Sequence, residues 1–181
     1  METVRTAECR LPSVVDDLRT VRGQRSEGES GESMSKTRRP LDAMYLSKTD
    51  EWETPQDVFD ALNAEFLFNL DAAASDSNHK CSLYYTQESD GLQQSWEGFR
   101  VFCNPPYSQI AAWVEKAFRE TRHDKTLVCL LIPARTDTKY FHDFILHRSE
   151  IRFLDHRLRF GNSTNNAPFP VLVVIFRGGR V

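Results

Sequence analysis

From about residue 45 onward, apolar residues follow two spacings, one typical of amphipathic helices and the other of buried strands. The pair Thr54-Pro55 is typical of a helix start, with Thr54 as the cap and Pro55 at the first helical position. The apolar face of the helix that follows is formed by four residues, Val58, Phe59, Leu62 and Phe66. We expect a short strand at residues 66–70 to end this unit and to run into Asp71.

Two more helices are predicted in the second half of the chain. The first is capped by Ser108, and its apolar face is formed by Ile110, Trp113, Val114, Ala117 and Phe118. The second begins at Thr136 and carries Phe141, Phe144 and Ile145. Residues 76–99 lack either spacing and are predicted to be irregular, apart from an apolar island at residues 83–85.

Further strands are predicted from short apolar runs. The run at 127–132 is continuous, as in a strand covered on both faces, and the others lie at 101–103, 151–154, 158–160 and 171–176. Strands that alternate with helices predict an α/β fold with a central, mostly parallel sheet flanked by helices. Ligands bind such sheets at the carboxyl ends of the strands, which is where Asp71 and Asn104 fall.

The first part of the chain differs from this pattern. Residues 22–40 are rich in Gly, Ser, Glu and Arg and contain little to bury, so residues 1–44 are predicted to form a flexible tail before one folded domain at 45–181. A hydrophobic content of 40% is typical of a globular protein. Because no apolar run reaches the roughly 18 residues that span a bilayer, and no signal-peptide pattern is seen, we expect a cytoplasmic protein without a membrane partner.

Charge is distributed unevenly between the two halves. Residues 41–99 carry two Lys or Arg against twelve Asp or Glu, whereas residues 100–181 carry thirteen against seven. A phosphate-binding surface, if the protein has one, is therefore expected in the second half. The four cysteines form no CxxC pair and the five histidines show no recognised ligand spacing, so no metal site is predicted and buried thiols are favoured.

The tetrapeptide Asn104-Pro105-Pro106-Tyr107, directly after an apolar strand, carries the clearest chemistry. Its prolines fix φ and hold a stiff turn with outward carbonyls, and the Asn104 side chain adds another carbonyl acceptor. Two converging acceptors suit an –NH2 group, and drawing on both of its hydrogens makes the nitrogen a better nucleophile. Tyr107 offers a flat face on which an extruded base can stack. The alternative is a Pro-rich turn capped by Asn104, with Tyr107 in the core.

This tetrapeptide resembles the catalytic motif of the amino-group DNA methyltransferases, and the wider chain resembles the phage-type Dam N6-adenine methyltransferases. Matching stretches occur in the family's order at 51–55, 70–75, 90–92, 104–107, 131–138 and 157–161. The resemblance implies a Rossmann-like, S-adenosylmethionine-dependent methyltransferase fold. It also implies that a methyl group passes from S-adenosylmethionine to the N6 amino group of adenine in DNA, by direct displacement on a flipped base.

The resemblance also implies roles for individual residues. The catalytic residues that hold and stack the target base are Asn104, Pro105, Pro106 and Tyr107. The residues matched to cofactor binding are Trp52, Thr54, Pro55, Asp71, Ala73 and Asp90. Those matched to the substrate site are Arg135, Thr136, Asp137, Arg157 and Phe160. The first cofactor motif departs from the Gly-rich form of many methyltransferases, because this chain has alanines at 72–74.

Several alternatives stay open at this point. Cytosine N4 and a glutamine side-chain amide present the same –NH2 group, and a non-catalytic DNA-binding relative could keep the fold. Locally, Asp71 could cap a helix, Asp90 could make a turn, and Trp52, Trp96 and Trp113 could belong to the core. The expected partner is double-stranded DNA, and the resemblance implies a phage or prophage protein in a bacterial cell. The recognition sequence and the oligomeric state are not predicted.

Overall fold

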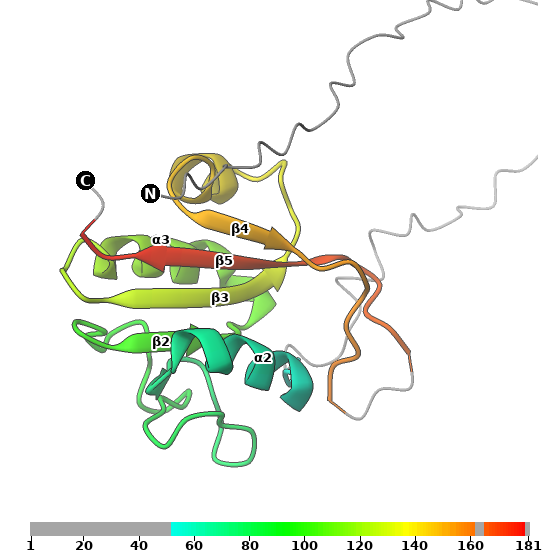
Figure 1. Ribbon diagram of the computed structural model, residues 1–181, viewed down its shortest axis with the longest axis horizontal. Coiled ribbons are helices and arrows are strands. Elements are labelled where there is room, and N and C mark those ends of the chain that lie inside the picture. Colours follow the sequence, from blue (N-terminus) through cyan, green and yellow to red (C-terminus); the bar gives the residue numbers. More distant parts are fainter. Residues whose placement is uncertain (1–51, 162–164, 180–181) are drawn as a thin grey trace, which may run out of the picture. The chain divides into compact units, whose positions relative to one another are not determined.

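A single five-stranded sheet organises the computed structural model, which describes residues 52–161 and 165–179. The strands are β1 (Leu70–Asp71), β2 (Arg100–Cys103), β3 (Leu127–Pro133), β4 (Glu150–Phe153) and β5 (Val171–Arg177). Their order across the sheet is β1-β2-β3-β5-β4 (Figure 1). β1, β2 and β3 are parallel, while β5 runs antiparallel to both β3 and β4. Four strands thus point the same way, which confirms the predicted α/β class and the mostly parallel sheet.

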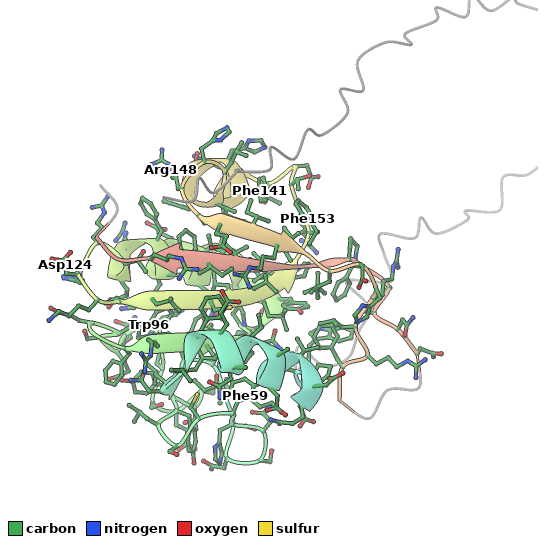
Figure 2. All side chains as sticks on the ribbon, viewed as in Figure 1. Phe59, Trp96, Asp124, Phe141, Arg148 and Phe153 are labelled. Atoms are coloured by element: carbon green, nitrogen blue, oxygen red, sulfur yellow. The ribbon has the colours of Figure 1, made fainter. Side chains whose placement is uncertain are left out.

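Consecutive strand residues point to opposite faces of the sheet, and both faces of these strands are apolar. Each face is therefore covered by helices. On one face, helix α2 (Gln56–Phe66) packs through Phe59, Leu62 and Phe66 onto Phe102 and the odd-numbered residues of β3 (Figure 2). On the other face, helix α3 (Ile110–Glu120) packs onto Val101 and the even-numbered residues of β3 (Figure 1). Residues 128–133 and 171–176 are buried throughout, as expected for strands covered on both sides.

The third helix packs on the α3 face through Phe141 and Ile145. It consists of an α-helical turn at residues 139–140 and a π-helical segment, η2 (Phe141–Ile145). The predicted start at Thr136 is wrong, because residues 136–138 form a turn in which the Thr138 hydroxyl donates to the Arg135 carbonyl at 2.8 Å. Phe153, the last residue of the edge strand β4, is 75% exposed (Figure 2).

Both predicted helix caps are wrong. Helix α2 has Pro55 as its N-cap with no side-chain bond, and the hydroxyl of Thr54 instead accepts from Asn104 at 3.0 Å. Ser108 lies inside a 3-10 turn, η1 (Tyr107–Gln109), so that Gln109 is the N-cap of α3. A hydroxyl next to a helix start can serve a distant partner, and the local sequence does not show which use prevails.

Two predicted strands also need correction. Helix α2 continues to Phe66, and its C-cap Leu67 has φ 52°, so only Leu70 of the predicted strand at 66–70 joins the sheet, where it forms β1 with Asp71. Residues 158–160 are extended but form no ladder. Among the described residues, the Ala167 N–H donates to the Leu158 carbonyl at 2.8 Å, and this bond is not continued into a ladder. Leu158 and Phe160 are buried, so the apolar spacing reported burial and not strand pairing.

Cys81, Cys103 and Cys129 are buried free thiols, which confirms that part of the sequence prediction. Burial raises the pKa of Cys129 to about 12. Within the described residues, no helix has the length and apolar character needed to span a membrane. The predicted tail at residues 1–44 lies outside the described part of the chain.

Candidate active site

The carboxyl ends of the parallel strands form one edge of the sheet, and most of the predicted site residues lie along it. Asp71 ends β1 and Ala73 follows it, residues 104–107 follow β2, and residues 135–137 follow β3. β4 also ends at this edge and β5 begins there, so the connection at 154–170 lies on the same side (Figure 1). This is where ligands bind open α/β sheets.

The side chain of Asn104, directly after β2, is held by hydrogen bonds to residues 52 and 54, which precede helix α2. Its side-chain Nδ2 donates to the backbone carbonyl of Trp52, in a short hydrogen bond, and to the Thr54 hydroxyl at 3.0 Å. Its Oδ1 is buried and accepts no hydrogen bond from any residue that the structure describes. A buried acceptor without a partner costs about 1–3 kcal/mol, so this oxygen is suited to accept a hydrogen bond from a ligand.

Tyr107 belongs to a cluster of four aromatic rings. Its ring stacks on Trp52, with centroids 6.0 Å apart and planes 18° apart, and meets the edge of Phe169 at 5.5 Å. Phe160 completes the cluster, with its centroid 5.3 Å from that of Trp52, and is only 4% exposed. Trp52 thus contacts both ends of the tetrapeptide, through its carbonyl at Asn104 and its indole at Tyr107.

Asp71 is 3% exposed, and its carboxylate is used by the protein itself. One oxygen accepts the Lys80 N–H at 3.0 Å and the other accepts the Ala73 N–H at 3.4 Å. Burial raises the pKa of this carboxyl to about 6, although the Lys80 N–H opposes the shift. No helix follows Asp71, so the helix-cap alternative is wrong; the carboxylate instead closes the loop at residues 72–80.

Asp90 lies beside the same loop. It has φ 49° and its carboxylate accepts the Leu92 N–H at 3.1 Å, so the turn that was considered as an alternative is present. A Cβ on Gly91 would lie 2.1 Å from the Ala72 carbonyl oxygen, so only glycine allows this close approach. The Asp90 side chain is nevertheless exposed. It can therefore still bind a hydroxyl or amino group of a ligand placed next to Ala73.

The remaining predicted residues lie on two loops. Arg135 is half-buried, and Thr136 and Asp137 are exposed after β3. The Arg157 guanidinium donates to the carbonyls of Pro168 at 2.6 Å and Ala167 at 3.4 Å. A pocket of about 360 Å³ is lined by Pro55, Asp57, Val58, His156, Arg157, Leu158, Arg159 and Asn166. Two of the predicted residues, Pro55 and Arg157, thus share one pocket although they belong to different groups in the prediction.

The structure brings the Trp52–Thr54 segment, Asn104, Tyr107 and Phe160 together, and places Asp71, Ala73 and Asp90 on the β1 side of the same edge. Trp96 and Trp113 stack on each other in the core, at 0% and 5% exposure, as the alternative reading of those residues held. Phe169 was missed, because its apolar surroundings do not distinguish a site residue from a core residue. The role of the Trp52 carbonyl was also missed, since no side chain signals it.

Comparison with known proteins adds to this geometry. The family model described as DNA N-6-adenine-methyltransferase (Dam) matches residues 43–177. A DNA N-6-adenine-methyltransferase of Escherichia phage T1 is 33% identical over 59% of this chain, and the match spans 45% of that relative. A protein of the same name from Haemophilus phage HP1 is 31% identical over 72% of this chain and 80% of its own length. The predicted family is confirmed, and this chain belongs to the DNA N-6-adenine-methyltransferase (Dam) family.

Proposed function

We propose that this chain transfers a methyl group from S-adenosylmethionine to the N6 amino group of an adenine in DNA. The observation that carries this proposal is the buried Oδ1 of Asn104, which has no partner among the described residues. It lies at the carboxyl end of β2, beside an aromatic cluster that suits a flat base. Family membership supplies the reaction class, and this atom supplies a place for the amino group to bind.

The chain's contribution to the chemistry is to hold the amino group. Oδ1 of Asn104 accepts one N6 hydrogen, and the carbonyl of Pro105 offers a second acceptor, since the Pro106 carbonyl already accepts the Gln109 N–H at 3.0 Å. Withdrawal of both hydrogens from the ring plane reduces conjugation and leaves the nitrogen lone pair more nucleophilic. When bound, S-adenosylmethionine supplies an electrophilic methyl group on its sulfonium. Positioning and these two acceptors then account for catalysis.

The β1 side of the edge suits the adenosine and methionine parts of S-adenosylmethionine. The alanines at 72–74 keep the backbone approachable, and the exposed carboxylate of Asp90 can accept hydrogen bonds from a hydroxyl or amino group. Asp71 acts one step away, by holding the loop that carries Ala73. The parallel strands β1 to β3, with ligand residues at their carboxyl ends, support the Rossmann-like methyltransferase fold as part of this proposal.

The DNA partner is proposed to be double-stranded, with the target adenine flipped out of the helix to reach Asn104. The guanidinium groups of Arg157 and Arg159 line the pocket next to Pro55, and they suit phosphates that flank the target. Arg135, Thr136 and Asp137 lie on the neighbouring loop of the same edge. The phage relatives support action in the cytoplasm of a bacterial host.

The test is to incubate the full chain with DNA and isotope-labelled S-adenosylmethionine, and to analyse the nucleosides by mass spectrometry. The proposal predicts labelled N6-methyladenine, and none when Asn104 is replaced by Ala. Labelled N4-methylcytosine would reassign the target to the other base amino group that this site can hold. No labelled nucleoside, from a chain shown by calorimetry to bind the cofactor, would contradict methyl transfer to DNA.

A further inference from the structure

We infer that Thr54 and the backbone carbonyl of Trp52 set the orientation of the Asn104 amide, so that its oxygen and not its nitrogen faces the target amino group. This inference rests on the proposed function, in which Oδ1 of Asn104 accepts from the adenine N6. It assigns Thr54 a positioning role in the reaction. The resemblance had placed Thr54 beside the cofactor, but its hydroxyl oxygen accepts from Asn104 at 3.0 Å.

A side-chain amide can rotate by 180° and exchange its oxygen and nitrogen with almost no change of shape. The carbonyl of Trp52 distinguishes the two orientations, because it can accept a hydrogen bond but never donate one. In the observed orientation it receives a hydrogen from Nδ2. In the rotated one, two carbonyl oxygens would face each other, and Nδ2 would present its hydrogens to an amino group that also donates.

Thr54 accounts for the remaining hydrogen of the amide. Nδ2 carries two hydrogens, and its two acceptors are the Trp52 carbonyl and the Thr54 hydroxyl. Thr54 is 4% exposed, so water does not readily replace its hydroxyl. With both hydrogens used, the amide presents only Oδ1 to the site, where that atom is buried without a partner among the described residues.

The segment that carries these two acceptors is itself anchored. The Trp52 indole stacks on Tyr107 and meets Phe160 and Phe169 edge-on. The Glu53 carbonyl accepts the Gly161 N–H at 2.9 Å, which ties the residue between the two acceptors to the connection at 154–170. Asn104 is therefore oriented by a segment 50 residues away in sequence, and a change at Thr54 should reach the reaction only through Asn104.

The test compares Thr54→Val, Thr54→Ser and Thr126→Val with the full wild-type chain. Thr54→Val keeps the shape and removes the acceptor, so we expect kcat to fall about tenfold while both KM values change less than about twofold. Thr54→Ser should restore kcat to within about twofold of wild type. Thr126 is the matched control, because it is 1% exposed and its hydroxyl accepts the Gly98 N–H at 2.9 Å, before the start of β3 and away from the carboxyl edge. Its replacement should leave kcat unchanged.

A second readout does not depend on turnover. The exchange of the two side-chain amide hydrogens of Asn104 with water can be measured by NMR on 15N-labelled protein. Both hydrogens should exchange slowly in wild type, and one should exchange markedly faster in Thr54→Val. Unchanged exchange, or an unchanged kcat with a raised KM for S-adenosylmethionine, would overturn the inference. A wild-type chain that makes no N6-methyladenine but shows this exchange pattern would refute the proposed function and leave the amide orientation supported.

Discussion

Asp71 and Asn104 both lie at the carboxyl ends of adjacent strands, Asp71 as the last residue of β1 and Asn104 directly after β2, yet their polar atoms are used differently. Both oxygens of Asp71 accept backbone N–H groups, from Lys80 and Ala73. Asn104 is satisfied only through its nitrogen, and its oxygen is buried without a partner in the described part of the chain. A fully used polar group stabilises the protein, whereas a half-used one is available for chemistry. Location at a strand end does not distinguish a structural residue from a proposed catalytic one. The hydrogen-bond partners of each polar atom do.

The largest effect that this comparison predicts is on the Asn104 side. Replacing Asn104 by Ala removes the acceptor for the target amino group, so we expect kcat to fall about 10³-fold, the scale seen when a preorganised transition-state contact is lost. The affinity for S-adenosylmethionine, measured by isothermal calorimetry, should stay within about threefold of wild type. A variant that kept full activity would remove the basis for treating the two strand ends differently.

The next effect concerns the stability supplied by Asp71. Its pKa is raised from 3.8 to about 6 in the folded protein, so between about pH 4 and pH 6 the folded state binds more protons than the unfolded state. This carboxyl therefore contributes stability at pH 4 that is lost as the pH rises to 6. Since Asp71→Asn cannot titrate, the free energy of unfolding of wild type relative to this variant should fall by about 2 kcal/mol between pH 4 and pH 6. The full change, from well below pH 4 to well above pH 6, should be about 3 kcal/mol, at about 1.4 kcal/mol per pKa unit.

Urea unfolding of wild type and Asp71→Asn at a series of pH values measures the difference between their free energies of unfolding. The contributions of the other carboxyl groups are the same in both proteins and cancel in this difference. A constant difference would mean that Asp71 is not protonated on folding.

The sequence predicted the elements of the fold better than it predicted the contacts around Asp71 and Asn104. The carboxyl ends of β1 and β2 could be located, because long apolar runs and helical spacing report burial directly, and burial fixes β3, α2 and α3. Thr54 was assigned to the wrong partner, since a hydroxyl that can cap a helix can equally accept from Asn104. The strand predicted at 158–160 is wrong because its apolar spacing reports the burial of Leu158 and Phe160, whereas strand pairing depends on backbone partners elsewhere in the chain.

The site itself was predictable only in part. The tetrapeptide at 104–107 could be located from the sequence because its four residues are adjacent, and the amino-binding role that it suggests remains a proposal. The use of both Asp71 oxygens was not predictable, since the Lys80 N–H comes from an irregular loop whose path no periodic pattern records. The same holds for Phe169, which joins the aromatic cluster by tertiary packing alone.

A smaller effect is expected at Tyr107, on the Asn104 side of the comparison. Tyr107→Ala removes the aromatic face next to Trp52, and base stacking is worth about 1–3 kcal/mol, so KM for DNA should rise about tenfold or more. Tyr107→Phe keeps the ring and should stay within about twofold. The measurement is steady-state kinetics with varied DNA at saturating cofactor. Equal losses in both variants would show that the hydroxyl, not the stacking face, is what matters.

The smallest effect is expected at Asp90, on the Asp71 side. Asp90→Asn keeps an acceptor for the Leu92 N–H but removes a charged acceptor that is exposed to the ligand, so the affinity for S-adenosylmethionine should fall about three- to tenfold. Calorimetry with S-adenosylmethionine and with S-adenosylhomocysteine measures it. Asp76→Asn, at another exposed carboxylate, is the matched control and should not change either affinity.

The most direct test of the central claim is a single-turnover comparison of Asn104→Ala and Asp71→Asn in one assay, with saturating DNA and S-adenosylmethionine at a pH where both variants are folded. The labelled N6-methyladenine formed per second reports the chemical step alone. We predict that Asn104→Ala loses about 10³-fold in this rate, while Asp71→Asn stays within about threefold of wild type. Comparable losses in the two variants would contradict the claim that the unpartnered oxygen of Asn104 marks the catalytic strand end.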